Sequence, residues 1–287
     1  MTTEFTASAG RDFQVNGLKI HANTWGEFST PERTVFLIHG LSANSMCWAG
    51  LGPELAGRGW FVVAPDLRGR GFSDKPAHGY GTPIHTNDLL ALADELGIER
   101  LNLVGHSLGA IITLFLAAIH PERAGKLVLV DAGGVIPEDT VQAIAPSIKR
   151  LDTVYPSLET FLELMSKVPL YQWNIFWENY YRYDAVVRPD GTVTSGVARA
   201  TVEEENFVTA HTRFELLPNY IKVPTLIARA TVGLLGEGRG LILPAAEAER
   251  MQGVIPGSRV VAIPGTNHYT IILSKDFKNE VTAFLES

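Results

Sequence analysis

Short and almost wholly apolar runs recur along the chain, with helical patterns between them. A strand with one face in water alternates polar and apolar side chains, whereas a strand covered on both faces is apolar throughout. The runs therefore predict a mostly parallel sheet with helices on both sides. They are residues 34–38 (TVFLI), 60–64 (WFVVA), 101–104 (LNLV), 126–130 (KLVLV), 224–228 (PTLIA) and 259–263 (RVVAI).

The segments between these runs have apolar residues at helical spacing and end beside glycine or proline, which stop helices. The predicted helices are residues 84–96, 108–119 and 245–252. Near the start of the chain, Asn16-Gly17 separates two strand-like segments, which predicts a tight hairpin at an antiparallel edge. The predicted fold class is α/β, with a mostly parallel, doubly wound sheet.

The alternation of strand and helix stops after Asp131, and about ninety residues pass before the run at 224–228. Ordinary crossovers are several times shorter. We therefore expect a core domain made of residues 1–136 and 221–287, with residues 137–220 inserted as a helical cap. Within the cap, Arg188-Pro189-Asp190-Gly191 predicts a turn, and Glu203-Glu204-Glu205 is expected to be a solvated helix face.

Charge and cysteine content exclude several classes of partner. The net charge is −7, so no basic stripe is available to attract nucleic acid. Cys47 is alone, which excludes an internal disulfide and a cysteine-based zinc site, and the chain lacks an H-E-x-x-H pattern. We expect no metal and no cofactor. The expected partner is a small-molecule substrate, and assembly as a homodimer stays open.

No segment of the sequence is typical of a membrane protein or of a secreted one. The longest apolar stretch, residues 110–119, is far shorter than the roughly 20 residues of a membrane-spanning helix. The N-terminus lacks a charged region followed by an apolar one, so no signal peptide is predicted. We therefore expect a cytoplasmic protein with no membrane partner.

The pentapeptide Gly105-His106-Ser107-Leu108-Gly109 is the strongest functional motif. It directly follows the strand-like run at 101–104 and precedes a predicted helix, which is the context of a G-x-S-x-G nucleophile elbow. The sharp turn strains the backbone at the serine, and flanking glycines let strand and helix approach closely. The pattern predicts that Ser107 is a nucleophile projecting above the sheet.

With this motif the chain resembles the α/β-hydrolase superfamily, over nearly all of its length outside the expected cap. Two further motifs fall in the family order. His39-Gly40-Leu41 is similar to the family's oxyanion-loop motif, and residues 66–74 (DLRGRGFSD) are similar to its D-x-R-G-x-G-x-S-D signature. The resemblance implies the α/β-hydrolase fold with an inserted helical cap, and a hydrolase.

A serine hydroxyl is a weak nucleophile and needs a base. The best-placed histidine is His268, which follows the last core strand, where loops at the carboxyl ends of parallel strands converge. The family's commonest acid, an Asp soon after the run at 224–228, is missing. Glu237 is the only carboxylate in that segment, whereas Asp131 directly follows the run at 126–130.

The position of Asp131 is an alternative acid position in the superfamily. It resembles that of haloalkane dehalogenases and of serine amide hydrolases of the (E)-2-(acetamidomethylene)succinate hydrolase type. The loop around Glu237, followed by Gly-x-x-His-Tyr, is similar to that of the amide hydrolase. We favour Asp131 as the acid that orients His268 and keep Glu237 as the alternative.

The rest of the expected site surrounds these residues. The backbone N–H groups of Leu41 and Leu108 are expected to form the oxyanion hole. The cap is rich in aromatic residues, which either line a substrate pocket or pack the cap against the core. The candidate substrate-binding residues are Trp173, Phe176, Trp177, Tyr180 and Tyr181. Arg150, Arg182 and Arg188 are further candidates, for a substrate carboxylate.

These features predict a serine hydrolase that cleaves a small, apolar or aromatic carboxylic ester, lactone or amide through an acyl-enzyme with a Ser-His-Asp triad. The alternative reaction is hydrolysis of a carbon–carbon bond in a vinylogous diketone. Dehalogenation and epoxide hydrolysis are disfavoured, because the related enzymes carry Asp where Ser107 stands. An alternative of another class is a ligand-sensing receptor with weak hydrolysis.

Overall fold

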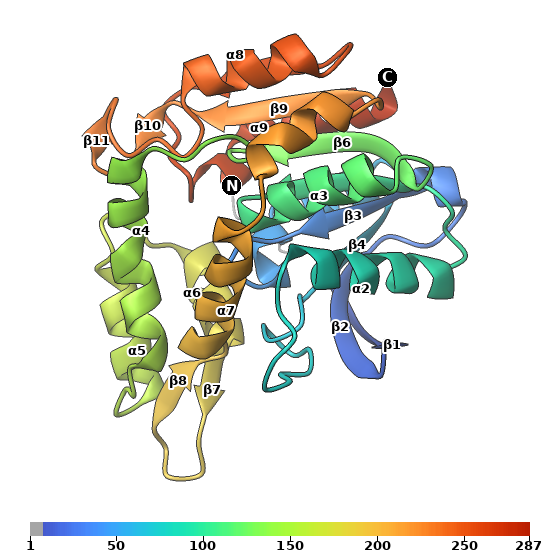
Figure 1. Cartoon of the computed structure of the whole chain (residues 1–287). Coiled ribbons are helices and arrows are strands. Elements are labelled where there is room, and N and C mark those ends of the chain that lie inside the picture. Colours follow the sequence, from blue (N-terminus) through green and yellow to red (C-terminus); the bar gives the residue numbers. More distant parts are fainter. Residues whose placement is uncertain (1–7) are drawn as a thin grey trace.

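The structure, a computed structural model, describes residues 8–287 (Figure 1). Residues 1–7 lie outside the described residues, and so does most of the N-terminal segment for which no signal peptide is predicted. An eight-stranded sheet forms the centre, in the order β1-β2-β4-β3-β5-β6-β9-β12. Its strands are β1 (Ala9–Val15), β2 (Leu18–Trp25), β3 (Thr34–Ile38), β4 (Phe61–Pro65), β5 (Leu101–His106), β6 (Ala124–Val130), β9 (Thr225–Ala230) and β12 (Arg259–Ile263).

The predicted α/β class is confirmed. In the eight-stranded sheet, all neighbouring strands from β4 to β12 pair in parallel, and β2 runs antiparallel to both of its neighbours, β1 and β4. The hairpin between β1 and β2 turns at Asn16 and Gly17, which both have positive φ, as the Asn-Gly pair predicts.

Helices cover both faces of the sheet, and the strand residues alternate between two apolar layers. Phe36 and Ile38 of β3 pack in one layer with α2 (Thr82–Glu95), α3 (Leu108–Ile119) and α8 (Ala245–Val254). Val35 and Leu37 pack in the other layer with α1 (Gly52–Ala56) and α9 (Lys275–Glu286). This burial of both faces explains why the strands read as continuous apolar runs.

The edge strand β12 is an exception to the expected burial on both faces. Only Ile263 of this strand is buried, because β12 is an edge strand with a neighbouring strand, β9, on one side only. The apolar run therefore predicts the strand correctly and its burial incorrectly.

The long segment between β6 and β9 folds into helices and a small hairpin beyond one end of the sheet (Figure 1). The hairpin turns between Arg188 and Gly191, as predicted. A second small hairpin follows β9. The elements of these parts are α4 (Glu138–Lys149), α5 (Leu158–Ser166), α6 (Ile175–Asp184), β7 (Ala185–Val187), β8 (Val193–Ser195), α7 (Arg199–Ala210), β10 (Val232–Gly233) and β11 (Gly236–Glu237).

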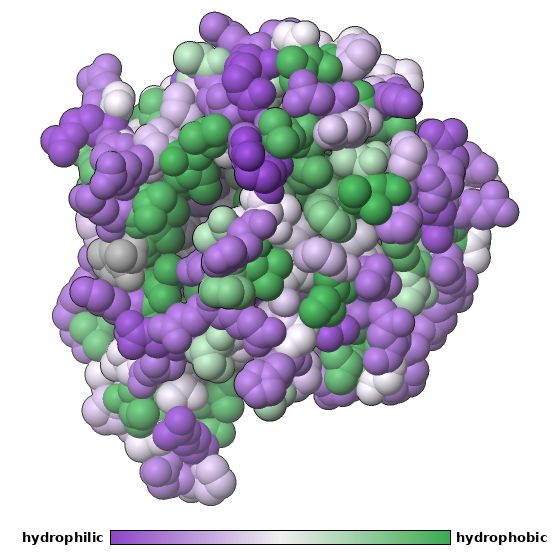
Figure 2. Space-filling model, viewed as in Figure 1, coloured by the Kyte–Doolittle hydropathy of each residue, from purple (hydrophilic) through white to green (hydrophobic). Residues whose placement is uncertain are grey.

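Figure 2 shows apolar side chains gathered alongside α4, around a hollow between α4 and α7. The carboxyl ends of the parallel strands face this part of the molecule (Figure 1). None of the helices in residues 8–287 is long and apolar enough to cross a membrane.

Candidate active site

Ser107 occupies the turn between β5 and α3. Its φ of 58° lies in the left-handed region, which is strained for a residue with a side chain. The flanking glycines make this turn possible: a Cβ on Gly105 would overlap the backbone of Gly109, and a Cβ on Gly109 would overlap the carbonyl of Ile38. The half-buried serine is therefore held at the carboxyl end of β5, against the first turn of α3.

His268 and Asp131 meet as a buried pair. The Nδ1 atom of His268 lies 2.9 Å from Oδ2 of Asp131, and the two residues are 8% and 1% exposed. The other carboxylate oxygen accepts a hydrogen bond from the Ala230 N–H at 2.9 Å. Asp131, like Ser107, has a positive φ, of 50°. The carboxylate is thus fixed at both oxygens, and the pairing through Nδ1 leaves Nε2 of the imidazole for other chemistry.

Two contacts bring this pair to the nucleophile. The Ser107 N–H donates to the carbonyl of Val130, the residue before Asp131, at 3.1 Å. The ring of His106 lies 4.5 Å from that of His268, and its Nε2 is 2.9 Å from the His268 carbonyl oxygen. Burial, with His268 nearby, lowers the pKa of His106 well below its usual value, so it is a neutral donor here.

The alternative acid, Glu237, is exposed on β11, at the tip of the small hairpin after β9. The carboxylate in contact with His268 belongs to Asp131.

The loop that carries Leu41 packs against the nucleophile. A Cβ added to Gly40 would lie 3.0 Å from the Cβ of Ser107 and 3.5 Å from its Oγ, so a larger residue there would crowd the nucleophile. In the part of the chain that the structure describes, the backbone N–H groups of Leu41 and Leu108 donate to no other protein group. These two donors are available to bind an anionic oxygen.

His39 fixes the orientation of the peptide between Gly40 and Leu41. Its Nδ1 lies 2.8 Å from the Gly40 carbonyl oxygen, and its Nε2 accepts from the Leu67 N–H at 3.0 Å. Burial lowers the pKa of His39 to about 3, which keeps the ring neutral and able to accept. Because the Gly40 carbonyl and the Leu41 N–H belong to one peptide plane, holding the carbonyl also aims the N–H.

The candidate aromatic residues mostly pack against one another. Phe176, Trp177, Tyr180 and Tyr181 are buried in the same apolar cluster as α1 and α9, whereas Trp173 is half-buried and stacks on Tyr181 at 6.0 Å between ring centroids. The four buried rings thus pack within the apolar cluster, while a role for any of the five in substrate binding stays a prediction. Only Trp173 keeps partial access to solvent.

The three candidate arginines have different surroundings. Arg182 is an exposed partner of Glu178, and Arg188 is exposed in the β7–β8 turn. Arg150 instead lies with its guanidinium 5.8 Å from the ring centroid of Tyr181, and its buried Nη1 has no hydrogen-bond partner among the described residues.

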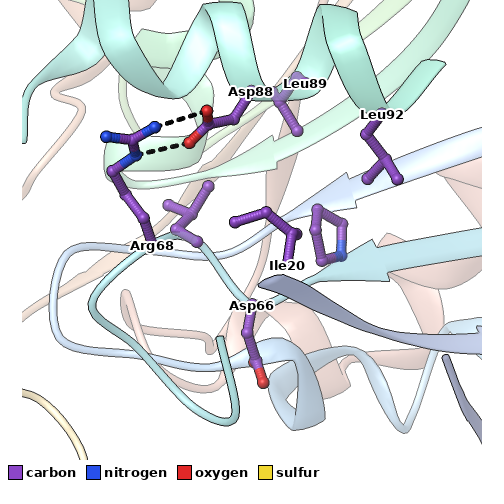
Figure 3. Close-up of a pocket in the computed structure, with 8 residues that line it drawn as sticks. Ile20, Asp66, Arg68, Asp88, Leu89 and Leu92 are labelled. Carbon is purple, nitrogen blue, oxygen red and sulfur yellow. Dashed lines mark hydrogen bonds and ion pairs between the residues drawn. The ribbon is translucent and has the colours of Figure 1, made fainter. Parts of the chain in front are cut away.

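The D-x-R-G motif supplies a network that the sequence analysis did not predict. Arg68 forms a two-pronged ion pair with Asp88 of α2 beside a small, mostly apolar cavity, and Asp66 points away from that pair (Figure 3). Asp66 is fully buried and accepts from the backbone of Ser45 and, at 2.6 Å, from the hydroxyl of Tyr183 on α6. The motif therefore joins the sheet to the segment between β6 and β9.

The expectation of a solvated face at residues 203–205 is wrong for two of the three glutamates. Glu203 is exposed, but Glu204 accepts from the backbone N–H groups of Gly79 and Tyr80, and Glu205 is fully buried. Docking of α7 against the core places this face inside the molecule.

Among the described residues, no group of three or more His, Cys, Asp or Glu is arranged to hold a metal ion.

Comparison with known proteins agrees with the fold described above. Residues 33–275 match the model of a family described as alpha/beta hydrolase fold. A 2-(acetamidomethylene)succinate hydrolase from Mesorhizobium japonicum is 27% identical over 261 residues, which cover 88% of each protein. A 2-hydroxy-6-oxononadienedioate/2-hydroxy-6-oxononatrienedioate hydrolase from Burkholderia vietnamiensis is 29% identical over 231 residues, which cover 73% of each.

Among solved structures, a crystal structure of E-2-(acetamidomethylene)succinate hydrolase superposes with a TM-score of 0.84. The match covers 98% of this chain and 100% of the other, at 21% sequence identity. At that identity the likeness concerns the fold.

Proposed function

The chain belongs to the alpha/beta hydrolase fold family, and on this premise we propose that it is a serine hydrolase that cleaves a small carboxylic ester, lactone or amide through an acyl-enzyme. The observation that carries the proposal is the buried pair of His268 and Asp131, 2.9 Å apart, at the same end of the sheet as the strained turn at Ser107. Acyl transfer by a serine needs a base that a buried carboxylate orients, and this pair supplies both groups.

In the proposed reaction, Asp131 accepts a hydrogen bond from Nδ1–H of His268, so that Nε2 is free to take the proton of the Ser107 hydroxyl. The serine oxygen attacks the substrate carbonyl, and the N–H groups of Leu41 and Leu108 stabilise the resulting oxyanion. His268 then gives the proton to the leaving alcohol or amine. In the second half, His268 deprotonates water, which attacks the acyl-enzyme and releases the acid and Ser107.

The test compares turnover of a panel of short and aromatic esters, lactones and N-acyl amides by the unmodified protein, Ser107→Ala and Ser166→Ala. Ser166 lies at the end of α5, where, among the described residues, its hydroxyl bonds only to the Glu163 carbonyl, so Ser166→Ala is a matched control. We expect Ser107→Ala to abolish turnover and the control to retain it. Near-normal activity of folded Ser107→Ala would contradict the mechanism.

The same panel includes a ring-fission diketone, because one relative is named for hydrolysis of a compound of that class. Turnover of the diketone alone would favour carbon–carbon bond hydrolysis with the same residues. Labelling of Ser107 by a fluorophosphonate without sustained turnover of any substrate would favour a ligand-sensing role.

We further propose that the substrate carries a carboxylate group and that Arg150 binds this group. Two observations support this step. The buried Nη1 of Arg150 has no hydrogen-bond partner among the described residues, although a buried guanidinium N–H is costly to leave unpaired. The relatives are named for a succinate and for dioates, which carry carboxylates.

Arg150→Gln tests the carboxylate, with Arg182→Gln as the exposed control. A hydrogen bond to a charged group contributes about 1.5–3 kcal/mol, so we expect kcat/KM for p-nitrophenyl hemisuccinate to fall by about 10- to 100-fold in Arg150→Gln. The value for p-nitrophenyl butyrate, which is neutral, should change little. Equal losses on both esters would contradict a carboxylate role.

A further inference from the structure

We propose that Glu205, on helix α7 between β6 and β9, is a positioning residue for the oxyanion loop and acts through Arg70 on Leu41. This inference rests on the proposed function, because it assigns a role in the same reaction. On this inference, helix α7 helps to align the oxyanion loop in addition to packing over the sheet.

The first step is a buried cluster of three side chains from distant segments. The carboxylate oxygen Oε2 of Glu205 lies 2.6 Å from Nε2 of His85 on α2 and 3.3 Å from Nη2 of Arg70. All three side chains are 0% exposed. Because none of the three side chains is exposed, bulk water does not compete for these contacts.

The second step leads from the cluster to the oxyanion loop. Arg70 donates through Nε to the Leu41 carbonyl oxygen at 3.1 Å and through Nη1 to the Arg68 carbonyl oxygen at 3.0 Å. A guanidinium is planar, with its donors in a fixed fork. The orientation of the fork, which Glu205 sets from the far side, therefore determines where the Leu41 carbonyl lies.

The third step is a second contact between Leu41 and the same part of the chain. The side chain of Leu41 packs against a small apolar cluster made of Leu151, Val197 and Val202, all between β6 and β9. Val202 and Glu205 are both on α7. Helix α7 thus contacts the side chain of Leu41 directly, through Val202, and the carbonyl of Leu41 indirectly, through Glu205 and Arg70.

Charge balance explains why Glu205 cannot be replaced by an uncharged group without consequence. Burial lowers the pKa of Arg70, and Glu205 is the strongest influence that opposes this effect. Burial acts to raise the pKa of Glu205, but His85 and Arg70 outweigh it and the net pKa is lowered. The pair is therefore ionised together, and removing one charge leaves the other buried without compensation.

The test is Glu205→Gln, with Glu204→Gln as the matched control on the same helix. Glu204 also ties α7 to the core, through the N–H groups of Gly79 and Tyr80 at 3.0 and 3.1 Å, but among the described residues it makes no hydrogen bond to Arg70, His85 or Leu41. The substrate is p-nitrophenyl acetate, whose short acyl group needs little contact with the helices above the sheet.

Loss of one oxyanion donor costs about 100- to 1,000-fold in kcat, and misalignment costs part of that. We therefore expect Glu205→Gln to lower kcat by roughly 10-fold with KM within about twofold, and to weaken binding of phenylboronic acid, which forms a tetrahedral adduct with the serine, in the same proportion. Glu204→Gln should leave kcat within about twofold, even where thermal unfolding shows that it lowers stability.

A folded Glu205→Gln variant with normal kcat and normal boronate affinity would overturn the inference, and so would equal kcat losses in the two variants. If Glu205→Gln does not fold, the double variant Arg70→Met/Glu205→Leu replaces the buried ion pair by apolar groups, a change that is often tolerated. It lacks the hydrogen bond to Leu41, so the same loss of kcat is expected, and normal kcat would overturn the inference. The proposed function is tested by a different result: it would be contradicted if turnover did not depend on Ser107, whatever the effect of Glu205→Gln.

Discussion

Replacing Asp131 by asparagine should reverse the hydrogen bond that orients His268. Asparagine has the size of aspartate, tolerates the positive φ of 50° at this position, and keeps an oxygen for the Ala230 N–H. Its amide nitrogen then faces Nδ1 of His268 and donates to it. The imidazole must carry its proton on Nε2, where it can no longer take one from Ser107.

The size of the effect follows from the geometry of the pair. When His268 accepts a proton it becomes an imidazolium 2.9 Å from the Asp131 carboxylate. At an effective dielectric constant of about 20, this attraction is about 6 kcal/mol. A barrier higher by about 5.5 kcal/mol slows a reaction by about 10,000-fold, which is also the loss known for this substitution in a Ser-His-Asp triad.

The assay is steady-state turnover of p-nitrophenyl acetate by the unmodified protein, Asp131→Asn and Glu237→Gln. We expect kcat to fall by about four orders of magnitude in Asp131→Asn. Glu237 is exposed on β11, so Glu237→Gln should match the unmodified protein. Thermal unfolding of each variant shows whether the protein is still folded, so that a loss of activity caused by the wrong His268 tautomer can be told from one caused by unfolding. Activity of Asp131→Asn within tenfold of the unmodified protein, or a collapse in Glu237→Gln alone, would refute this reasoning.

Three further predictions concern the scaffold of the site. Gly109→Ala places a Cβ against the Ile38 carbonyl, so urea unfolding should show a loss of about 1–3 kcal/mol or no folded protein, and unchanged stability would contradict the close approach. His39 has a folded pKa of about 3 against an unfolded value near 6.5, so as pH falls between these values the unfolded chain takes up a proton that the folded protein does not. The free energy of unfolding should therefore fall by about 1.4 kcal/mol per pH unit on account of this residue, and stability curves of His39→Gln that are no shallower would argue against it. Tyr183→Phe removes the 2.6 Å hydrogen bond to Asp66, with an expected loss of about 1.5–3 kcal/mol in chemical unfolding; a variant as stable as the unmodified protein would mean that this bond does not help to hold α6.

Local patterns in the sequence determine the sheet and the turn that holds the nucleophile. Strands buried on both faces must be apolar throughout, so β3 and α3 are found with the bounds predicted for them. The turn at Ser107 needs glycine on both sides because backbone lies within overlap distance of any Cβ there. These requirements are met by residues that are neighbours along the chain, and one sequence is enough to reveal them.

Contacts between segments far apart in the sequence were decided only by the tertiary structure. Asp131 and Glu237 were both reasonable partners for His268, and which carboxylate contacts the imidazole depends on where β6, β11 and the His268 loop meet in space. Likewise, the glutamates of α7 have the composition of a solvated face. The burial of Glu205 follows from the docking of that helix against Arg70 and His85, each more than a hundred residues away in the chain.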